Sequence, residues 1–167
     1  MAVGKMKSVL VIGGFGFIGG HLCKKYEDKG FNVVRTSRFY DIEETKNTFK
    51  IDYSEASFNT ILCIHDFDLV FFMSGNPYPA FSEDNAAYDL DHTIIPIINL
   101  LNAMVKTNFK GSFWYASSVA VYGRTHLQFQ GENDACEPLS SYATAKLTCE
   151  YYLKFFSNKY GLSCGSF

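Results

Sequence analysis

The chain has 167 residues, of which 47% are apolar and 19% are charged, a composition that suits one globular domain and argues against extended disorder. Fifteen Lys and Arg residues stand against 17 Asp and Glu residues, giving a formal charge of −2. The sequence therefore lacks the global basic field that holds a nucleic acid or an anionic membrane, and we expect neither as a partner. An anionic ligand must be held locally.

The cysteines and histidines predict no metal site. The five cysteines are odd in number, widely spaced and never in a Cys-x-x-Cys pair, which indicates neither a disulfide framework nor zinc and fits a reducing cytoplasm. The four histidines show no ligand spacing (His21, His65, His92 and His126). The apolar run over residues 9–20 contains five glycines and is too short to span a bilayer, so it is predicted to be neither a signal peptide nor a membrane span.

The start of the chain predicts a β-α-β unit. Residues 8–12 form a short apolar run that ends in glycines, as expected of a strand buried on both faces of a parallel sheet. A helix is predicted over residues 16–29, and Gly30 stands where a helix commonly ends in a left-handed glycine. Residues 31–36 predict the second strand.

Strands and helices continue to alternate along the rest of the chain. Further strands are predicted over residues 49–51, 68–73, 112–116 and 162–167, and further helices over residues 54–63, 83–105 and 140–160. Pro96 predicts a kink or a break in the long helix, and Ser140 or Ser141 is the expected N-cap of the last helix, which Gly161 closes. Residues 123–139 are predicted to be a surface loop. This alternation predicts a doubly wound α/β fold with a parallel sheet.

Glycines between the first strand and the first helix have the spacing Gly-x-x-Gly-x-x-Gly. In such a loop Gly13 permits a tight turn, Gly16 lets the backbone approach a pyrophosphate, and Gly19 allows close packing of helix on strand. The helix N-terminus adds free N–H groups and the positive end of the helix dipole. An ordinary tight turn is the alternative. The predicted dinucleotide site consists of Gly13, Gly14, Phe15, Gly16, Phe17, Ile18 and Gly19.

The end of the second strand predicts which dinucleotide binds. An Asp or Glu there accepts hydrogen bonds from the adenosine ribose, whereas an arginine favours a 2′-phosphate. This strand end contains no carboxylate, and Arg38, with Ser37 and Arg35 as further candidates, favours NADP(H), with NAD(H) as the alternative. Solvated surface arginines are the other interpretation. Asp52 follows the third strand, where it either meets the adenine amino group or is an exposed turn residue.

Three residues nearer the C-terminus predict an acid–base site. Ser118 follows the fifth strand, at the sheet edge where the carboxyl ends of parallel strands line a ligand crevice. Tyr142 and Lys146 are four residues apart on one predicted helix, so they share a face. A phenol has a pKa of about 10 and needs a nearby cation to act near neutrality, which Lys146 and an oxidised nicotinamide together provide. Tyr-x-x-x-Lys alone is a weak signal, with surface packing as its alternative.

Together these motifs resemble the extended short-chain dehydrogenase/reductases, also called the NAD-dependent epimerase/dehydratase family, whose members mostly act on nucleotide sugars. The matching elements are the glycine loop, residues 117–123, Glu132, Pro138 and residues 141–146. The resemblance implies that Tyr142 is the catalytic acid/base and that Lys146 holds the nicotinamide ribose and lowers the tyrosine pKa. It further implies that Ser118 hydrogen-bonds the reacting hydroxyl or carbonyl.

The sequence departs from the family's pattern in three respects. Dehydratases of the family usually carry Asp-Glu after the hydroxyl residue, and Val119-Ala120 stands there, which argues against a 4,6-dehydratase and leaves epimerase, reductase or decarboxylase-like chemistry. Thr93 begins a segment that commonly reads Asn-x-x-Gly-Thr, before a retained Asn99-Leu100-Leu101. Family members are generally much longer and form the sugar-nucleotide pocket from their C-terminal half.

We therefore expect residues 1–167 to be the dinucleotide-binding domain of a cytoplasmic sugar-nucleotide epimerase or reductase, ending in or after the sixth strand and without the C-terminal substrate domain. Two alternatives stay open. One is a non-catalytic dinucleotide-binding module. The other is a truncated fragment, whose unfinished sheet edge and exposed apolar face favour aggregation or a homodimer.

Overall fold

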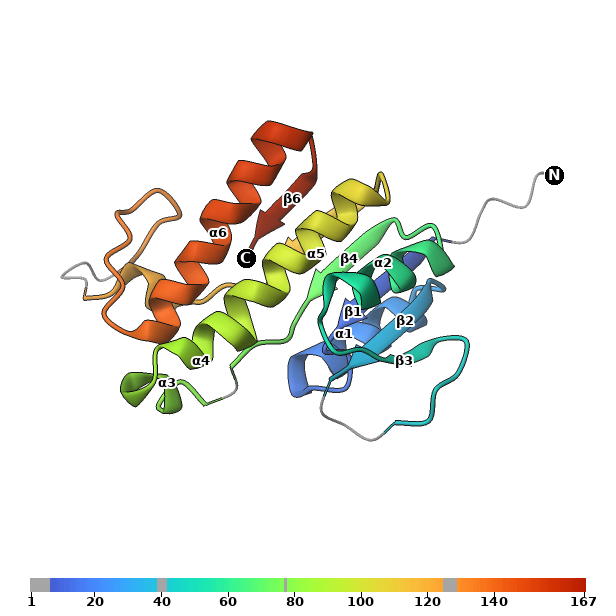
Figure 1. The fold of residues 1–167 in the computed structure, drawn as a ribbon, viewed down its shortest axis with the longest axis horizontal. Coiled ribbons are helices and arrows are strands. Elements are labelled where there is room, and N and C mark those ends of the chain that lie inside the picture. The colour runs from blue at the N-terminus through green and yellow to red at the C-terminus, as the bar shows by residue number, and fades with distance from the viewer. Residues whose placement is uncertain (1–6, 39–41, 77, 125–128) are drawn as a thin grey trace.

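The computed structural model describes residues 7–38, 42–76, 78–124 and 129–167 (Figure 1). A sheet of six parallel strands forms its centre, in the order β3-β2-β1-β4-β5-β6. The strands are β1 (Ser8–Ile12), β2 (Asn32–Ser37), β3 (Thr48–Lys50), β4 (Leu69–Phe72), β5 (Ser112–Tyr115) and β6 (Ser163–Ser166). This strand order is that of the Rossmann fold, so the predicted doubly wound α/β class is confirmed.

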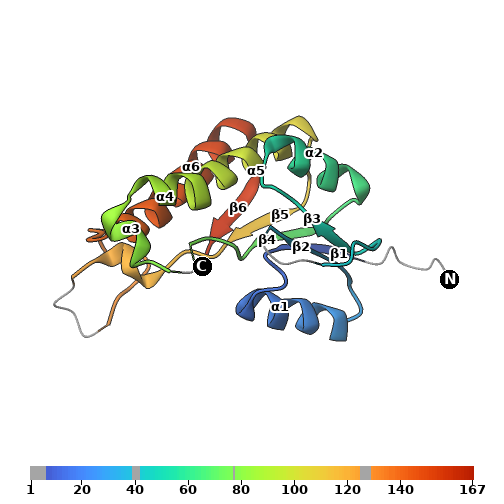
Figure 2. The same ribbon diagram turned by 60° about the horizontal axis from the view of Figure 1, so that its bottom comes forward.

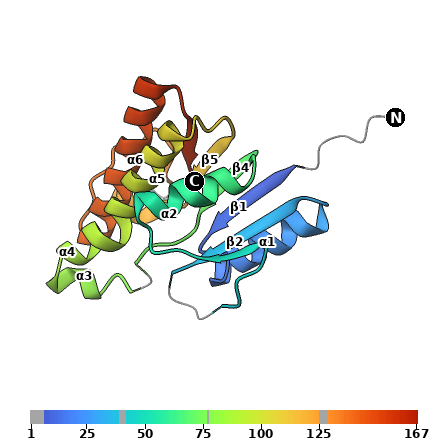
Figure 3. The same cartoon turned by 45° about the vertical axis from the view of Figure 1, so that its right-hand side comes forward.

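Helices cover the two faces of the sheet unequally. The α-helices are α1 (Phe17–Asp28), α2 (Glu55–Ile64), α3 (Phe81–Asp84), α4 (Ala87–Asp89), α5 (Ile95–Lys106) and α6 (Ser141–Tyr160). Figure 2 shows α1 alone on one face, with α2, α5 and α6 together on the other. Helices α5 and α6 run side by side, as Figures 1 and 3 both show.

Each face of the sheet has its own hydrophobic core. The larger core lies between the sheet and the three helices, where Leu10, Phe72 and Leu100 are fully buried. The smaller core lies under α1 and contains Val9 and Val11. Alternate residues of β1 thus enter opposite cores, which explains why this strand is apolar at every position apart from its first residue.

Most of the predicted elements match the observed ones to within one residue at each end. Ser140 is the N-cap of α6, and its hydroxyl oxygen accepts a hydrogen bond from the N–H of Ala143. Gly161 follows that helix in the left-handed conformation, with φ 70°. The described part of the predicted loop over residues 123–139 contains no helix or strand; residues 125–128 of it lie outside the described residues.

The prediction of a single long helix over residues 83–105 is wrong in its first half. Glu83 belongs to the separate short helix α3, and a π-helical turn, η1 (Leu90–Ile94), joins α4 to α5. Pro96 lies in the first turn of α5, directly after that π turn. Proline has no N–H to continue an α-helical ladder, whereas the first turn of a helix tolerates it. The chain therefore changes helix type directly before the proline, which agrees with the break predicted there.

The strand order places a ligand crevice between β1 and β4. The chain leaves β1 toward α1 on one face of the sheet and leaves β4 toward α3, α4 and α5 on the other (Figure 2). In open α/β sheets, ligands bind beyond the carboxyl ends of the strands at such a switch point.

Candidate functional site

The loop after β1 turns sharply and is attached to β2. Gly13 has φ 80°, a left-handed conformation that suits glycine. The N–H groups of Gly13 and Gly14 both donate to the carbonyl oxygen of Thr36, at 3.1 and 3.2 Å. Gly16 closes the turn, because its N–H donates to the carbonyl oxygen of Gly13 at 3.0 Å. The tight turn predicted for Gly13 is thereby confirmed.

The first turn of helix α1 packs closely against this loop. A Cβ atom on Gly19 would lie 2.3 Å from the carbonyl oxygen of Gly13, so only glycine fits. Gly16 is the N-cap and provides no side-chain cap, and the first helical hydrogen bond runs from the N–H of Gly20 to the carbonyl oxygen of Gly16. The N–H groups of the first turn therefore have no acceptor within the helix and can bind an anion.

A cleft of about 530 Å³ lies beyond the carboxyl ends of the central strands and unites most of the predicted residues. Predicted residues that line it are Gly13, Phe15, Gly16, Phe17, Ile18, Gly19, Ser37, Arg38, Tyr142 and Lys146. Gly14 does not line it, because this residue faces the space between α1 and β2, where a Cβ atom would lie 3.0 Å from both Cys23 Sγ and Arg35 Cβ. Ser118 and Asp52 also lie outside its lining.

The sequence analysis missed several residues that line the same cleft. These are Tyr53, Met73, Ser74, Gly75, Asn76 and Ala116, together with Ser117. All of them follow the ends of β3, β4 or β5. The rule that parallel strands present ligand residues at their carboxyl ends was applied to β5 and could have identified those after β4 as well.

At the end of β2, the two arginines differ in their contacts. Arg38 lines the cleft, and its Cζ atom lies 5.4 Å from the ring centroid of Tyr53. Arg35 instead forms an ion pair with Glu27 of α1. Among the predicted phosphate ligands, Arg38 and Ser37 are therefore the two that line the cleft.

Lys146 is the most deeply buried cation of the site, with 5% of its surface exposed. Its ammonium group donates to the carbonyl oxygen of Ala116 at 2.7 Å and lies 4.8 Å from the ring centroid of Tyr115 and 5.6 Å from that of Tyr142. Burial lowers the pKa of Lys146 to about 8. The lysine is thus charged at neutral pH and held close to Tyr142.

We expect Lys146 to make the free energy of unfolding rise between about pH 8 and pH 10.5. Its pKa is about 8 when folded and 10.5 in a model compound, so in this window the unfolded chain binds one more proton than the folded chain. The charged lysine opposes folding below the window, by on the order of 3 kcal/mol, and the penalty is gone above it.

A Lys146→Met variant isolates this effect in urea unfolding. Cys23 and Cys149 act in the opposite direction, because burial raises each thiol pKa from 9.0 to about 11. Cys23 acts equally in both proteins, whereas the charge of Lys146 lowers the pKa of Cys149, so its removal in the variant adds to the difference in the same direction. The stability of the variant relative to the unchanged chain should therefore fall by about 3 kcal/mol from pH 8 to pH 10.5. A difference that stays constant over this range contradicts the depressed lysine pKa.

Tyr142 is anchored through its neighbour Ser141 to a buried carboxylate. The hydroxyl of Ser141 donates to Asp89 Oδ2 at 2.9 Å, and Asn76 Nδ2 donates to Asp89 Oδ1 at 3.0 Å. Asp89 and Asn76 are both buried, and Asn76 also lines the cleft. This network joins the loop after β4 to the start of α6 and so fixes Tyr142 relative to the cleft wall.

Ser118 lies beside the cleft, in a neighbouring pocket that it shares with Ser117, Glu132 and Glu150. Its Oγ accepts a hydrogen bond from the N–H of Ala120 at 3.2 Å and caps the 3-10 helix η2 (Val119–Tyr122). Ser117 lines both pockets, and its hydroxyl donates to Glu150. The substrate contact predicted for Ser118 therefore stays a prediction.

Asp52 has the properties of an exposed turn residue. Its Oδ1 accepts a hydrogen bond from the N–H of Ser54 at 2.9 Å, and the hydrogen bonds from Ser54 and Ser57 lower the pKa of its carboxyl to about 2. The contact with adenine stays a prediction.

Thr93 occupies the position of the family's asparagine and lies behind Gly75, a residue of the cleft wall, without lining the cleft itself. It is fully buried, and its Oγ1 finds no hydrogen-bond partner among the described residues. A Cβ atom on Gly75 would lie 4.0 Å from that Oγ1 and 3.6 Å from Lys146 Nζ, so both polar groups border one small space. Thr93 Oγ1 is thus an unpartnered buried polar atom close to the cleft wall.

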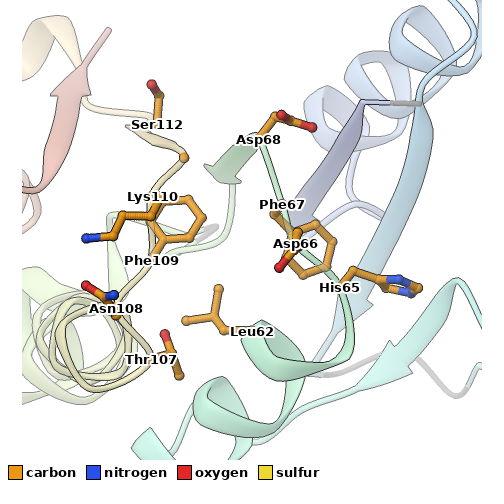
Figure 4. A pocket seen from close by; sticks show the side chains of 11 residues that line it. Leu62, His65, Asp66, Phe67, Asp68, Thr107, Asn108, Phe109, Lys110 and Ser112 are labelled. Atoms are coloured by element: carbon orange, nitrogen blue, oxygen red, sulfur yellow. The ribbon is translucent and has the colours of Figure 1, made fainter. Parts of the chain in front are cut away.

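A second pocket of about 510 Å³ lies at the opposite edge of the sheet, before β4 and β5 (Figure 4). Leu62 and Phe109 line it together with Asp66 and Lys110, while the ring of His65 points away from Lys110. Because ligands of this fold bind at the carboxyl ends of the strands, this pocket is not our candidate site.

In the described ranges, no three His, Cys, Asp or Glu side chains gather as metal ligands; His126 is outside them. No helix in that part of the chain has the length and apolar character needed to cross a membrane.

Known proteins to which this chain is similar include several UDP-glucose 4-epimerases. A putative UDP-glucose 4-epimerase of Methanocaldococcus jannaschii is 27% identical over 159 residues, 92% of this chain and 52% of that protein. The structure of a Thermotoga maritima UDP-glucose 4-epimerase with UDP-glucose has a TM-score of 0.83 and 28% identity, covering 95% of this chain and 54% of that one. A Brucella ovis UDP-glucose 4-epimerase in complex with NAD has a TM-score of 0.88, which at 24% identity shows the fold alone, over 96% of this chain and 50% of that one. The chain thus spans about half the length of the relatives it matches.

A family model described as the NAD dependent epimerase/dehydratase family matches residues 9–167, from β1 through the end of β6. The match includes the glycine loop, the end of β2 and the Tyr142–Lys146 pair that line the cleft. On this match, the chain belongs to the NAD dependent epimerase/dehydratase family.

Proposed function

We propose that residues 1–167 form the dinucleotide-binding half of an oxidoreductase or epimerase that acts on a nucleotide sugar by reversible hydride transfer. One observation carries this proposal: a single cleft joins the glycine loop, the end of β2 and the Tyr142–Lys146 pair. A site for phosphates alone needs no phenol with a buried lysine beside it. An acid–base site alone needs no glycine loop.

The residues present fit a nicotinamide dinucleotide. The first turn of α1, entered through Gly16, offers N–H groups to a pyrophosphate. Lys146 lines the cleft and donates one hydrogen bond to Ala116, so its ammonium group has further donors for a ribose hydroxyl. When bound, the nicotinamide supplies the hydride acceptor and donor.

In the proposed mechanism the protein's own residues move and hold the proton. Tyr142 takes the proton of the substrate hydroxyl during oxidation and returns it during reduction. Lys146, charged at neutral pH, lies 5.6 Å from the ring centroid of Tyr142, beside the group that is to move the proton. Ser118 is assigned to hydrogen-bonding the reacting oxygen, on the strength of the family resemblance.

The substrate class rests on the relatives. The relatives from Methanocaldococcus jannaschii and Thermotoga maritima are named as UDP-glucose 4-epimerases. Val119 and Ala120, in place of the Asp-Glu of the dehydratases, support an epimerase or a reductase over a 4,6-dehydratase. We assign this chemistry to a whole protein that also forms a nucleotide-sugar pocket.

Incubation of the whole protein, including the segment that forms the nucleotide-sugar pocket, with UDP-glucose and either NADP⁺ or NAD⁺ tests this function. Nicotinamide reduction followed by absorbance, or a new sugar nucleotide detected by chromatography, is the expected result. The second candidate is a non-catalytic dinucleotide-binding module, for which the glycine loop and the end of β2 in one cleft suffice. Dinucleotide binding with no turnover of UDP-glucose or other nucleotide sugars supports that candidate and contradicts the first.

We further propose that the preferred cofactor is NADP(H), with Arg38 as the ligand of the 2′-phosphate. Arg38 and Ser37 line the cleft, and the end of β2 carries no carboxylate to accept ribose hydrogen bonds. Replacing Arg38 by alanine should weaken NADPH binding by about 10-fold or more, since hydrogen bonds to charged groups are the strong ones, and should leave NADH binding unchanged.

Calorimetric titration of both nucleotides measures this change. Arg35→Ala is the matched control, because Arg35 comes from the same strand but pairs with Glu27, so it should leave the NADPH affinity as it is. Equal weakening of NADPH and NADH by Arg38→Ala contradicts the role in selecting the 2′-phosphate.

The homodimer and the cytoplasmic location stay predictions. The homodimer is supported by the position of β6 at the edge of the sheet and by Tyr151 and Phe155, which α6 exposes to solvent.

A further inference from the structure

The turn between β3 and α2 contains a residue in an uncommon conformation. Tyr53 has φ 64°, in the left-handed region, where bulky side chains are rare. Such a conformation persists only where the surrounding contacts fix it. Tyr53 also lines the dinucleotide cleft, although only 4% of its surface is exposed. Tyr53 is therefore a buried aromatic residue, held in a strained conformation, at the wall of the cleft.

Contacts from three separate elements hold Tyr53 in place. Asn99 of α5 donates from Nδ2 to the carbonyl oxygen of Tyr53 at 3.0 Å. The hydroxyl of Tyr53 donates to Ser74 Oγ after β4, at 2.6 Å. Its ring packs against Phe58 of α2 and Phe72 of β4, each at 5.8 Å between ring centroids. The ring is therefore a fixed surface.

Arg38 lies over this fixed ring, with Cζ 5.4 Å from the ring centroid. A guanidinium group is attracted to the face of an aromatic ring, and a long arginine side chain loses much rotational freedom when it is held in one place. A group that is already held when the ligand arrives binds it with less loss of entropy. Arg38 and Tyr53 line the same cleft, so the ring can hold the guanidinium where a phosphate is to bind.

The geometry points to Tyr53 as a positioning residue that holds the Arg38 guanidinium ready for the 2′-phosphate of NADP(H). This inference rests on the proposed role of Arg38. It goes beyond that role by assigning part of the cofactor preference to Tyr53, which lies in the turn after β3. Asn99, which this chain retains from the family's pattern, supports the same role, because its side chain hydrogen-bonds the backbone of Tyr53.

A matched pair of variants tests the inference. Tyr53→Leu removes the ring and should weaken NADPH binding by about 2- to 5-fold, the size of a cation–π contact, with NADH binding unchanged. Tyr53→Phe keeps the ring and loses only the hydrogen bond to Ser74, so its NADPH-to-NADH affinity ratio should equal that of the unchanged chain. Calorimetry gives both affinities, and circular dichroism confirms that each variant is folded. If Tyr53→Leu does not fold, Tyr53→Met takes its place, because methionine fills irregular space in a core.

The combination with Arg38→Ala separates this inference from the proposed function. If Tyr53 acts through Arg38, adding Tyr53→Leu to Arg38→Ala causes no further loss of NADPH affinity. Additive losses, an unchanged ratio in Tyr53→Leu, or equal loss of NADPH and NADH overturn the positioning role while leaving Arg38 as the phosphate ligand. If Arg38→Ala itself leaves the ratio unchanged, it is the 2′-phosphate role that fails, and the inference built on it is overturned with it.

Discussion

Replacing Gly19 by alanine should destabilise the chain by about 3 kcal/mol and weaken dinucleotide binding roughly 10- to 100-fold. The added Cβ would lie 2.3 Å from the carbonyl oxygen of Gly13 and 3.1 Å from the Cα of Gly14. Both are backbone atoms, so no side chain can move aside, and the start of α1 must shift away from the loop. That shift moves the N–H groups that are to bind the pyrophosphate.

Gly20 offers the control for this substitution within the same helix turn. A Cβ there would lie 3.8 Å from the carbonyl oxygen of Gly14, an ordinary contact distance. Gly20→Ala should therefore stabilise the chain slightly, because alanine favours a helix by about 1 kcal/mol over glycine, and it should leave binding intact. Urea unfolding and calorimetric titration of both variants check the pair. Equal behaviour of the two variants contradicts the proposed close packing at Gly19.

Replacing Tyr142 by phenylalanine should lower kcat roughly 10²- to 10⁴-fold and leave dinucleotide affinity unchanged. The substitution removes one oxygen atom and keeps the ring over which Lys146 lies. Loss of a proton-transfer group slows the chemical step, whereas the pyrophosphate and ribose contacts stay in place. Initial rates with UDP-glucose, together with titrations of NADPH, measure the two effects separately.

Tyr151→Phe is the matched control on α6, because Tyr151 is exposed and lies outside the cleft. It should leave both kcat and binding as they are. If Tyr142→Phe retains full turnover, Tyr142 is not the acid/base. If Tyr142→Phe instead abolishes dinucleotide binding, the tyrosine serves to build the site.

The elements that the sequence predicts correctly are those determined by residues close to one another in the chain. The strand β1 is recognisable because it is apolar at nearly every position, and α6 because Ser140 and Gly161 mark its two ends. The glycine loop is recognisable because its geometry requires glycine: Gly13 has a left-handed φ, and Gly19 has no room for a Cβ atom. The π turn before Pro96 was missed, because its residues have the same apolar spacing as an α-helix.

The residues of the site that were missed depend on contacts between distant segments. Nothing in the sequence near Tyr53 indicates a left-handed conformation, which is set by Asn99, 46 residues further along the chain. Asp89 is similarly fixed by Ser141, 52 residues away, and a sequence pattern contains no sign of that pairing. Arg35 lies within β2 and pairs with Glu27 of α1, whereas Arg38 follows the end of the strand and lines the cleft, a difference that depends on where α1 packs.

Whether the cleft binds a dinucleotide is measured by calorimetric titration of the 167-residue chain with NADPH and, separately, with NADH, which needs no knowledge of the sugar. We expect saturable binding at one site, with NADPH bound more tightly than NADH. A chain that is folded by circular dichroism yet binds neither nucleotide contradicts the assignment of this cleft as a dinucleotide site.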